Sequence, residues 1–299
     1  SQLIKSIELG GSMSENFRPD RKRGQVYFPI IRKANQGRPL LMGILNITPD
    51  SFYSNSRYSA DDAVKKAQLM IKNGADWVDI GGESTRPGAS AVSIDEEIER
   101  VIPVIKQLRA DNESIMISID TRNHQVARLA LENGANMVND VSGLRDKNMV
   151  DLIIETKCAV CIMHMNGEPG SMQQNPEYDD VVEEVASYLE QQAQMLIDRG
   201  LPKELILIDP GIGFGKTQQH NLLLMKSAKR FQDLGLGLLW GVSRKSIIGH
   251  MTGKQNASER LAGTLASSLY GAQMGVDILR VHDIDEHDDF FKVYYGLTN

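Results

Sequence analysis

Residues 60–81 read ADDAVKKAQLMIKNGADWVDIG, and within them one pattern of apolar residues gives way to another. Over residues 60–74 the apolar residues recur at helical spacing, and the stretch ends on glycine, a common signal for the end of a helix. The apolar run that follows, residues 77–80, is short enough to predict a buried strand. The phrase N-G-A occurs at residues 73–75 and again at 133–135, so we expect the same helix-to-strand turn twice.

Short apolar runs of this kind recur along the whole chain and give eight candidate strands, at residues 40–45, 77–80, 115–119, 137–139, 159–163, 205–209, 237–241 and 278–281. Helical patterns separate them, for example at residues 60–74, 121–134 and 258–275. Alternating helices and strands that are apolar on both faces are typical of a parallel sheet covered by helices. Eight such units predict an α/β fold, a TIM (β/α)8 barrel, with a doubly wound sheet as the alternative.

The domain organisation that follows is a single barrel. We expect it at residues 40–299, after a short N-terminal extension, residues 1–39. The VYFPII segment of that extension is a candidate strand at the bottom of the barrel.

Composition excludes several classes of protein. Apolar residues make up 41% of the chain and charged residues 24%, as in ordinary soluble globular proteins. With 33 basic and 39 acidic residues the net charge is −6, which argues against a nucleic-acid partner. No apolar run approaches the roughly 20 residues that cross a bilayer, and the polar N-terminal segment lacks the features of a signal peptide. Cys158 and Cys161 lie in an apolar run, so we expect two core residues in a cytoplasmic protein.

Polar or ionisable residues stand at the carboxyl end of every candidate strand or directly after it. They are Asn46, the segment GGESTRPG at 81–88, Asp120, Asn139 with Asp140, His164, Asp209, the segment SRK at 243–245, and the segment RVH at 280–282. The carboxyl ends of the strands are where barrel enzymes build their active sites. We therefore predict one polar site at this end of the barrel, since helix capping alone does not explain a polar group after all eight strands.

The segment DPGIGFGKT, residues 209–217, resembles a phosphate-binding loop. However, Pro210 stands where the pattern G-x-x-x-x-G-K-[ST] requires glycine, so we expect no nucleotide-binding loop. Instead, Gly211, Gly213 and Gly215 are expected to let the backbone pass close to a flat ligand held by Asp209.

Eight motifs between residues 41 and 283 are specific when taken together and in order: MGILNITPDSF, DIGGESTRPGA, SIDT, NDVSG, MHMNG, DPGIGFGK, GVSRKSIIG and RVHD. This set resembles the signature of the dihydropteroate synthase family. The resemblance implies a transferase that joins (7,8-dihydropterin-6-yl)methyl diphosphate to 4-aminobenzoate, giving 7,8-dihydropteroate and diphosphate in folate biosynthesis. It also implies Mg²⁺ as cofactor, a homodimer in which a small-residue helix at 261–274 is a candidate contact, and a target for sulfonamides.

The resemblance places the pterin among Asp120, Asn139, Asp209 and Lys245, with Met163 beside it. A pterin presents a guanidine-like edge of N–H donors, from which carboxylates and an amide oxygen accept. Two acids deep in a barrel raise each other's pKa unless a ligand or the lysine offsets them.

The diphosphate site implied by the resemblance comprises Asn46, Thr85, Arg86, Arg280 and His282, with Asn46 also a ligand of Mg²⁺. Mg²⁺ and fixed cations neutralise a leaving diphosphate, and the arginine fork matches phosphate oxygens. Catalysis is expected to depend on two of these residues, Arg280 and His282, together with three from the pterin pocket: Asp120, Asp209 and Lys245.

Residues Phe52, Pro87, Phe214 and Ser246 match positions that border 4-aminobenzoate in the family. The first loop departs from the family pattern, because it reads SFYSNS where SFSDGG is usual and so has Ser54 in place of an aspartate. The chemistry implied is early cleavage of the C–O bond followed by attack of the amine on a carbon with carbocation character, with no covalent nucleophile.

Two other functions remain open. One is a non-catalytic pterin-binding paralogue, which the altered first loop favours. The other is a methyltetrahydrofolate–corrinoid methyltransferase, in which the SRKS and RVHD motifs would have no diphosphate to hold.

Overall fold

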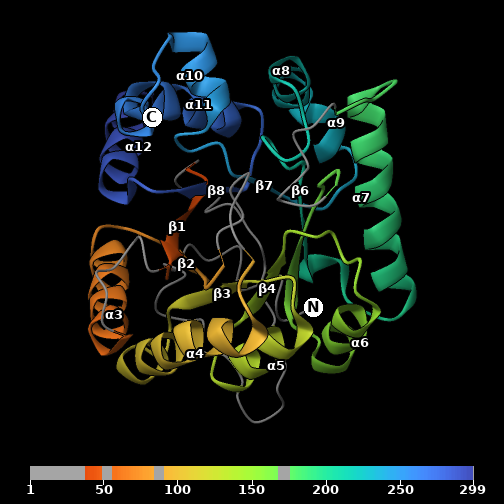
Figure 1. The fold of residues 1–299 in the computed structure, drawn as a ribbon. Coiled ribbons are helices and arrows are strands. Elements are labelled where there is room, and N and C mark those ends of the chain that lie inside the picture. The colour runs from red at the N-terminus through yellow and green to blue at the C-terminus, as the bar shows by residue number, and fades with distance from the viewer. Residues whose placement is uncertain (1–37, 49–55, 84–90, 168–175, 299) are drawn as a thin grey trace.

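The computed structural model describes residues 38–48, 56–83, 91–167 and 176–298. Within these ranges eight strands form a closed barrel in the order β1 to β8, and each strand is parallel to both neighbours. The helices follow one another around the strands in chain order (Figure 1). The predicted TIM barrel is confirmed, and the doubly wound alternative is wrong. The candidate strand in the N-terminal extension lies outside the described residues.

The strands span β1 Leu40–Asn46, β2 Trp77–Gly81, β3 Met116–Asp120, β4 Met137–Asp140, β5 Ala159–Met163, β6 Ile206–Asp209, β7 Gly237–Trp240 and β8 Ile278–Val281. The helices span α3 Ser56–Lys72, α4 Ile94–Asp111, α5 His124–Glu132, α6 Lys147–Thr156, α7 Val181–Asp198, α8 Gln218–Lys226, α9 Ala228–Gln232, α10 Ser246–Thr252, α11 Leu261–Gln273 and α12 Ile284–Thr298. Each of the eight predicted strands is present with its ends within one residue of the prediction.

The two N-G-A phrases form the same turn, as predicted. Gly74 and Gly134 have φ of 105° and 110°, a left-handed conformation that glycine adopts without strain. In both turns the alanine after the glycine donates its N–H to a carbonyl five residues earlier, which ends the helix and directs the chain into the next strand.

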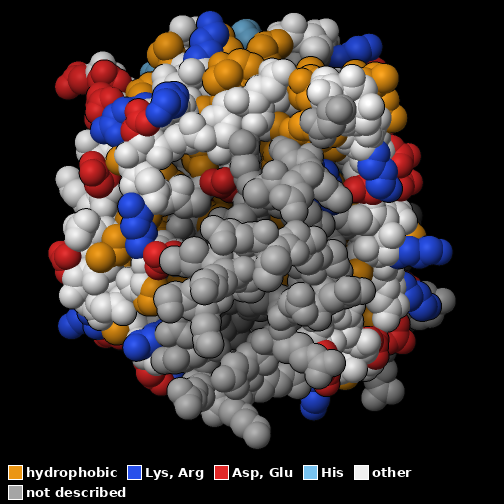
Figure 2. Space-filling view, turned by 180° about the vertical axis from the view of Figure 1, so that it is seen from behind, with side chains coloured by type: hydrophobic (Ala, Val, Ile, Leu, Met, Phe, Trp, Pro, Cys, Tyr) orange, Lys and Arg blue, Asp and Glu red, His pale blue; other side chains and the backbone are white. Residues whose placement is uncertain are grey.

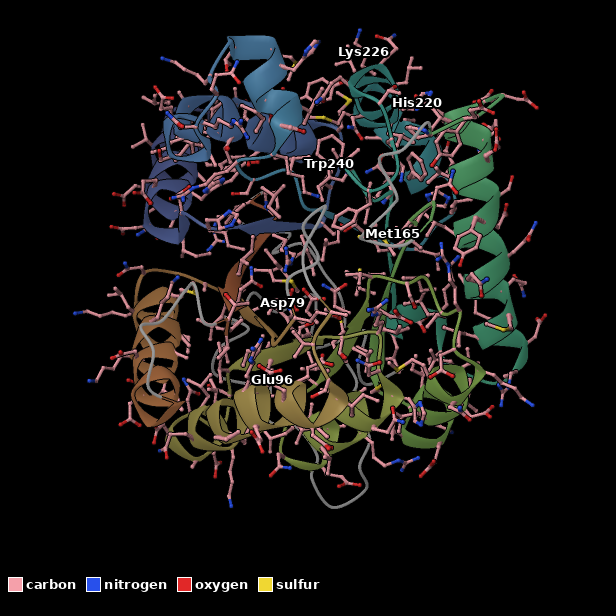
Figure 3. The ribbon with its side chains drawn as sticks, viewed as in Figure 1. Asp79, Glu96, Met165, His220, Lys226 and Trp240 are labelled. Carbon is pink, nitrogen blue, oxygen red and sulfur yellow. The ribbon has the colours of Figure 1, made fainter. Side chains whose placement is uncertain are left out.

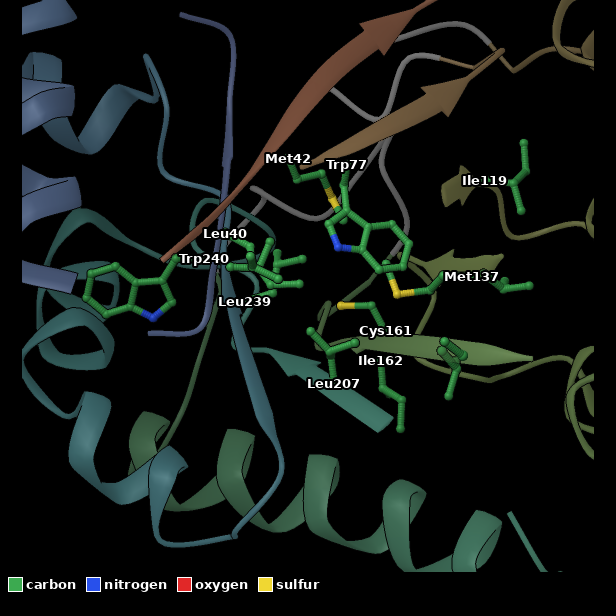
Figure 4. Packing of buried hydrophobic residues seen from close by; sticks show 14 of the residues in the cluster. Leu40, Met42, Trp77, Ile119, Met137, Cys161, Ile162, Leu207, Leu239 and Trp240 are labelled. Carbon is green, nitrogen blue, oxygen red and sulfur yellow. The ribbon is translucent and has the colours of Figure 1, made fainter. Parts of the chain in front are cut away.

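The lower part of the barrel interior is filled by apolar side chains. Trp77 packs there among Met42, Met137 and Cys161, all nearly or fully buried (Figure 4). Trp240 points the other way and packs on the Gly271 backbone of α11, so β7 is buried on both faces. This apolar plug closes the bottom and leaves the carboxyl ends of the strands for polar chemistry.

Buried residues elsewhere agree with the composition. Cys158 and Cys161 are free and buried, and burial raises the pKa of the Cys158 thiol to about 11, so both are inert core residues as predicted.

On the side of the barrel opposite the site, Arg38 pairs with Asp76 at 2.7 Å and with Asp288 at 3.2 Å, joining the residue before β2 to α12. None of the helices in the described part of the chain is both long and apolar enough to span a membrane.

Candidate active site

Five polar side chains from five strands face the barrel interior above the apolar plug: Asp79, Asp120, Asn139, Asp209 and Arg280. Their direction follows from the two-residue period of a strand. Asp79 comes two residues after the inward-facing Trp77, and Asn139 comes two after Met137 (Figures 3 and 4). Neighbouring strands in register therefore bring charged groups from distant parts of the chain into one buried layer.

Arg280 lies at the centre of this layer. Its Nε donates to Asp79 Oδ2 at 2.6 Å, and its Nη2 donates to Asp120 Oδ2 at 3.0 Å. Asn139 Nδ2 also donates to Asp79 Oδ2, at 3.2 Å. The guanidinium is thereby held in one orientation by two carboxylates from β2 and β3.

The two carboxylates share one cation, and their protonation reflects this. Burial, and after it the charge of Asp79, raises the pKa of Asp120 to about 8, and Arg280 only partly offsets this. Burial by itself would lower the pKa of Arg280, but Asp79 and Asp120 outweigh it and raise that pKa. At neutral pH Asp120 is therefore mostly protonated, whereas Arg280 is always charged.

A second carboxylate–cation pair lies on the β6–β7 side. Burial raises the pKa of Asp209, and the charge of Lys245 acts against this rise. Burial lowers the pKa of Lys245 to about 8, and Asp209 opposes that fall. The Lys245 ammonium donates to the carbonyl of Ile212 and lies 4.6 Å from the centre of the Phe214 ring.

The absence of a side chain at Gly241 leaves room between the two pairs. A Cβ at this position would lie 3.8 Å from Lys245 Nζ, 3.9 Å from Asp209 Oδ2 and 4.0 Å from the Cδ of Arg280. In addition, Oδ1 of Asp79 and Oδ1 of Asp120 are buried, and no other described residue forms a hydrogen bond with either atom. Buried acceptors of this kind are rarely left unpaired, so the layer is suited to a ligand with several N–H donors.

Comparison with known proteins agrees with this chemistry. The family model described as pterin binding enzyme matches residues 42–282. The dihydropteroate synthase of Escherichia coli strain K12 is 44% identical over 256 residues, which cover 85% of this chain and 90% of that protein. The chain belongs to the dihydropteroate synthase family. It is accordingly a transferase of folate synthesis.

Solved structures of dihydropteroate synthases share the fold. The Xanthomonas albilineans enzyme with 4-aminobenzoic acid superposes with a TM-score of 0.81 at 42% identity, covering 87% of this chain and 93% of that one. The same enzyme in complex with 7,8-dihydropteroate gives a TM-score of 0.79 at 38% identity, covering 87% and 94%.

Of the residues that the dihydropteroate synthase resemblance singled out, the structure brings most of the pterin set together. Asp120, Asn139, Asp209 and Lys245 line the buried layer described above, and Met163 is buried at the end of β5, paired in register with Asp209. Their arrangement in one layer is what the sequence predicted from strand ends.

The residues predicted for diphosphate are described only in part. Asn46 ends β1, and its Oδ1 lies 3.5 Å from the position that a Cβ on Gly81 would occupy, a position 3.4 Å from Asp120 Oδ2. His282 follows β8, and its Nδ1 lies 2.9 Å from Ser243 Oγ. Thr85 and Arg86 lie outside the described residues.

The residues predicted for 4-aminobenzoate are also divided. Phe214 packs against the small apolar cluster of Val141, Met163 and Met165. Ser246 begins α10 and accepts a hydrogen bond from Gln218 Nε2 at 3.2 Å. Phe52, Pro87 and the substituted Ser54 lie outside the described residues.

Sequence reasoning missed Asp79, which is fully buried and contacts both Arg280 and Asn139. It stood inside the predicted strand 77–80 and was counted as part of an apolar run. A carboxylate in the middle of a strand that is apolar on both sides was the available signal, because a buried charge requires a partner.

Sequence reasoning also gave no role to Lys216, which ties two loops of the site together. Its ammonium, 3% exposed, contacts His164 Nδ1 at 3.0 Å and donates to the Phe214 carbonyl at 2.9 Å. Burial lowers the pKa of Lys216 to about 7 and that of His164 to about 3, so the imidazole is the neutral acceptor.

The glycines at residues 211–215, in the loop that contains Lys216, allow segments of the backbone to pack closely against one another. A Cβ on Gly211 would lie 1.9 Å from the carbonyl oxygen of His164, and one on Gly215 would lie 2.3 Å from that of Asn166. Gly211 and Gly213 each face a lysine of the site, with Lys216 Nζ 3.3 Å from the position of a Cβ on Gly211 and Lys245 Cδ 3.4 Å from that on Gly213. The approach of these glycines to a flat ligand stays a prediction.

Proposed function

We propose that this chain condenses (7,8-dihydropterin-6-yl)methyl diphosphate with 4-aminobenzoate, releasing diphosphate and 7,8-dihydropteroate. The observation that carries the proposal is the buried layer in which two carboxylate oxygens have no donor among the described residues and two cations stand beside them. A pterin edge supplies the donors, and a diphosphate requires the cations. The relatives bound to 4-aminobenzoic acid and to 7,8-dihydropteroate support the same pair of substrates.

In this proposal the pterin lies over the position of the missing Gly241 side chain. Asp120 and Asp209 accept from its N–H groups, and Asn139 and Lys245 complete its polar edge. Met163 supplies an apolar contact below the ring. These residues hold the reactive methylene carbon in one place, which lowers the entropic cost of the attack.

The leaving diphosphate is held by Arg280, His282 and Asn46, together with Thr85 and Arg86. Asn46 is the residue that would hold Mg²⁺, and its neutral amide oxygen is a donor that this ion accepts. Among the described residues no cluster of three or more His, Cys, Asp or Glu side chains is placed to bind a metal, which suits an ion that takes most of its oxygen ligands from substrate phosphates and water. Bound there, Mg²⁺ would neutralise charge on the diphosphate as it departs.

The aromatic amine approaches from the side of Phe214 and Ser246, with Phe52 and Pro87 expected to border it. Departure of diphosphate leaves carbocation character on the methylene carbon, and the amine nitrogen attacks that carbon. Lys245, Arg280 and His282 stabilise the departing negative charge, while Asp120 and Asp209 fix the ring that bears the positive charge.

The experiment is a diphosphate-release assay with purified protein in which each substrate and Mg²⁺ is omitted in turn. We expect release only when both substrates are present, its loss in EDTA, and competition by a sulfonamide analogue of 4-aminobenzoate. Arg280→Ala and Lys245→Ala should each lower the rate about 10²- to 10³-fold. The matched controls Arg128→Ala and Lys229→Ala alter exposed residues remote from the site and should leave the rate unchanged.

Pterin binding without amine-dependent release would overturn the catalytic proposal and favour the non-catalytic paralogue. In that case Ser54→Asp restores the acid that the family usually has at this position. Recovery of release by that variant would assign the loss to the first loop.

We also propose that the chain forms a homodimer through the outer face of α11 and α12. Tyr270, Val293 and Leu297 are 37%, 63% and 82% exposed there, and apolar side chains gather along the upper edge of the molecule, over α10 and α11 (Figure 2). Light scattering should give twice the chain mass, and Val293→Asp should halve it. Leu69→Asp, on the remote helix α3 at a residue 56% exposed, is the control that should not.

We further place the protein in the cytoplasm. Two buried free thiols, Cys158 and Cys161, support a reducing compartment, where thiols stay reduced. Fractionation of cells that produce the full-length protein tests this, and recovery outside the cytoplasmic fraction would refute it.

A further inference from the structure

The loops after β7 and β8 are joined by a contact between Ser243 and His282. The backbone N–H of His282 donates to Ser243 Oγ at 3.1 Å. The same Oγ lies 2.9 Å from Nδ1 of the His282 ring. One hydroxyl therefore meets both the main chain and the imidazole of the same histidine.

The direction of the second hydrogen bond follows from the first. A serine hydroxyl has one hydrogen to donate and two lone pairs that accept. If Nδ1 carried the proton and donated to Oγ, the hydroxyl hydrogen of Ser243 would need another acceptor. Ser243 is 5% exposed, and the described contacts provide it with none. A buried unsatisfied donor is costly enough to disfavour that arrangement at least about fivefold.

We infer that Ser243 is a positioning residue that holds neutral His282 in the tautomer with its proton on Nε2. The hydroxyl donates to Nδ1, so Nδ1 is an acceptor and Nε2 is the N–H donor. The tautomer of a histidine is set by the hydrogen bond that its other ring nitrogen makes. This role rests on the proposed diphosphate site, since His282 is proposed to contact the diphosphate there.

A neighbouring contact keeps the two loops in register. Arg244, next to Ser243, forms a two-pronged ion pair with Asp283, which is next to His282. Arg244 is itself held in a left-handed conformation, with φ of 58°, and its N–H donates to Thr264 Oγ1 at 3.1 Å. Two adjacent side-chain pairs thus join the loops, and the Arg244–Asp283 pair keeps the Ser243 backbone beside His282.

The tautomer decides whether Nε2 of His282 presents a hydrogen-bond donor or a lone pair to the diphosphate. An Nε2–H group donates to a diphosphate oxygen, whereas the other tautomer presents a lone pair that repels it. A hydrogen bond to a charged group corresponds to about a tenfold to hundredfold effect on binding or rate. We therefore expect Ser243→Ala to raise KM for the pterin diphosphate, lower kcat, or both, by about this factor.

The decisive measurement is the tautomer itself, by ¹⁵N NMR of protein labelled in its histidine rings. His282→Gln assigns the signal, and the spectrum is recorded at a pH where titration shows this ring to be neutral. We expect Nδ1 to be unprotonated and Nε2 protonated in the wild type. Ser243→Ala should give a mixture of tautomers, and Ser243→Thr, which keeps the hydroxyl, should restore the wild-type spectrum and rate.

The chain offers a matched control in a second buried serine–histidine pair. Ser268 Oγ lies 2.9 Å from Nε2 of His287, on helices outside the site. Ser268→Ala removes a contact of the same kind and should change neither the His282 signal nor the kinetics of diphosphate release. Any general loosening of the fold would appear in both alanine variants.

The outcomes separate this inference from the proposed function. An unchanged His282 tautomer in Ser243→Ala overturns the inference, whatever the activity. A changed tautomer with an unchanged rate and KM shows that the tautomer does not matter to the reaction and overturns the positioning role. If the wild type releases no diphosphate, the proposed function fails, and the tautomer measurement still decides the Ser243–His282 assignment.

Discussion

Replacing Asp79 with asparagine removes one of the two carboxylates that face Arg280 and keeps the shape of the side chain. The new amide oxygen can still accept from Arg280 Nε, which lies 2.6 Å from Asp79 Oδ2. The amide nitrogen then occupies the position of Oδ1, which has no hydrogen-bond partner within the described ranges of the chain. The substitution therefore changes the charge of the buried layer more than its packing.

The buried layer can respond to this substitution in two ways, and the response with the lower free-energy cost sets the loss of stability. Leaving a buried arginine without an opposite charge costs about 3–5 kcal/mol of stability. Alternatively Asp120, 3.0 Å from Arg280 Nη2, ionises in place of Asp79. Its pKa is about 8, so ionisation at about pH 7 costs roughly 1.4 kcal/mol, and less once the charge of Asp79 no longer raises that pKa. Ionisation of Asp120 is the cheaper response, so we expect Asp79→Asn to lose about 1–2 kcal/mol.

The two carboxylates should then be strongly non-additive. Asp120→Asn alone removes a group that is mostly neutral and should cost about 1 kcal/mol, the value of one hydrogen bond. The double variant has no carboxylate beside Arg280 to ionise, so it should lose the full 3–5 kcal/mol or so. The single losses together are about 2–3 kcal/mol, so the middle of these ranges gives an expected coupling free energy of about 1.5 kcal/mol, within the range known for side chains in contact.

Urea denaturation at neutral pH measures the free energy of unfolding of all four proteins, provided that the slope with urea concentration is the same for each. Asp151→Asn, which removes an exposed partner of Arg199, is the control and should cost about 0–1 kcal/mol without coupling to Asp120. If the double variant loses an unfolding free energy equal to the sum of the two single losses, the idea that Asp120 ionises in place of Asp79 is refuted.

Three further substitutions test other contacts. Lys216→Met should remove a pH dependence of stability, because the pKa of Lys216 is about 7 in the folded protein and about 10.4 in the unfolded chain. Between these two pH values, the unfolding free energy of the wild type relative to the variant should rise by up to about 1.4 kcal/mol per pH unit. Urea titrations at several pH values measure this rise. Gly200→Ala should cost about 1–2 kcal/mol of unfolding free energy, because Gly200 has a positive φ. Gly211→Ala should cost at least twice as much, because Gly211 also has a positive φ and its new Cβ would meet the carbonyl oxygen of His164. Arg38→Met should lower stability by about 1–3 kcal/mol, because Asp76 and Asp288 each lose a buried charged donor, although Asp288 keeps Lys292 and Asp76 keeps the Leu41 N–H. The KM values should stay unchanged, because Arg38 lies on the opposite side of the barrel.

The fold was predictable because its rules are local. A parallel strand buried on both faces is a short apolar run, and the turn into β2 or β4 requires glycine at one fixed place. The errors lie at boundaries: α3 begins at Ser56 rather than residue 60, and Leu205 belongs to a 3₁₀ turn, Lys203–Leu205, rather than to β6. Such ends depend on loop contacts that periodicity does not encode.

The site was predictable only where a residue lies at the carboxyl end of a strand or just after it. Asp79 lies inside a strand, and its partner Arg280 is 201 positions away in the sequence. The two meet because closure of the barrel places β8 beside β1, with β2 next in order. No pattern within one segment indicates that pairing, so the residue was left in the apolar core.

Ser243 illustrates a different limit. The sequence places it after β7 among polar residues, but its role depends on which atom donates in two hydrogen bonds to one histidine. Direction of donation is a property of geometry and burial, and residue type alone leaves it undetermined.

The charge count of the buried layer predicts that Asp120, in particular, responds to a ligand. Three carboxyl groups, Asp79, Asp120 and Asp209, face two cations in the layer, Arg280 and Lys245, and the nearby Lys216, whose pKa falls to about 7, is only partly charged at neutral pH. Negative charge in the layer is therefore in excess. Asp120, whose pKa reaches about 8, holds a proton at neutral pH and so balances the layer without a third cation. A ligand that brings N–H donors to Asp120 favours its ionised form, because hydrogen bonds to a carboxylate lower its pKa. The N–H donors of the ligand thus offset the negative charge of Asp120 in place of its proton. This favours a neutral ring with several donors, such as a pterin, over a second anion at this position.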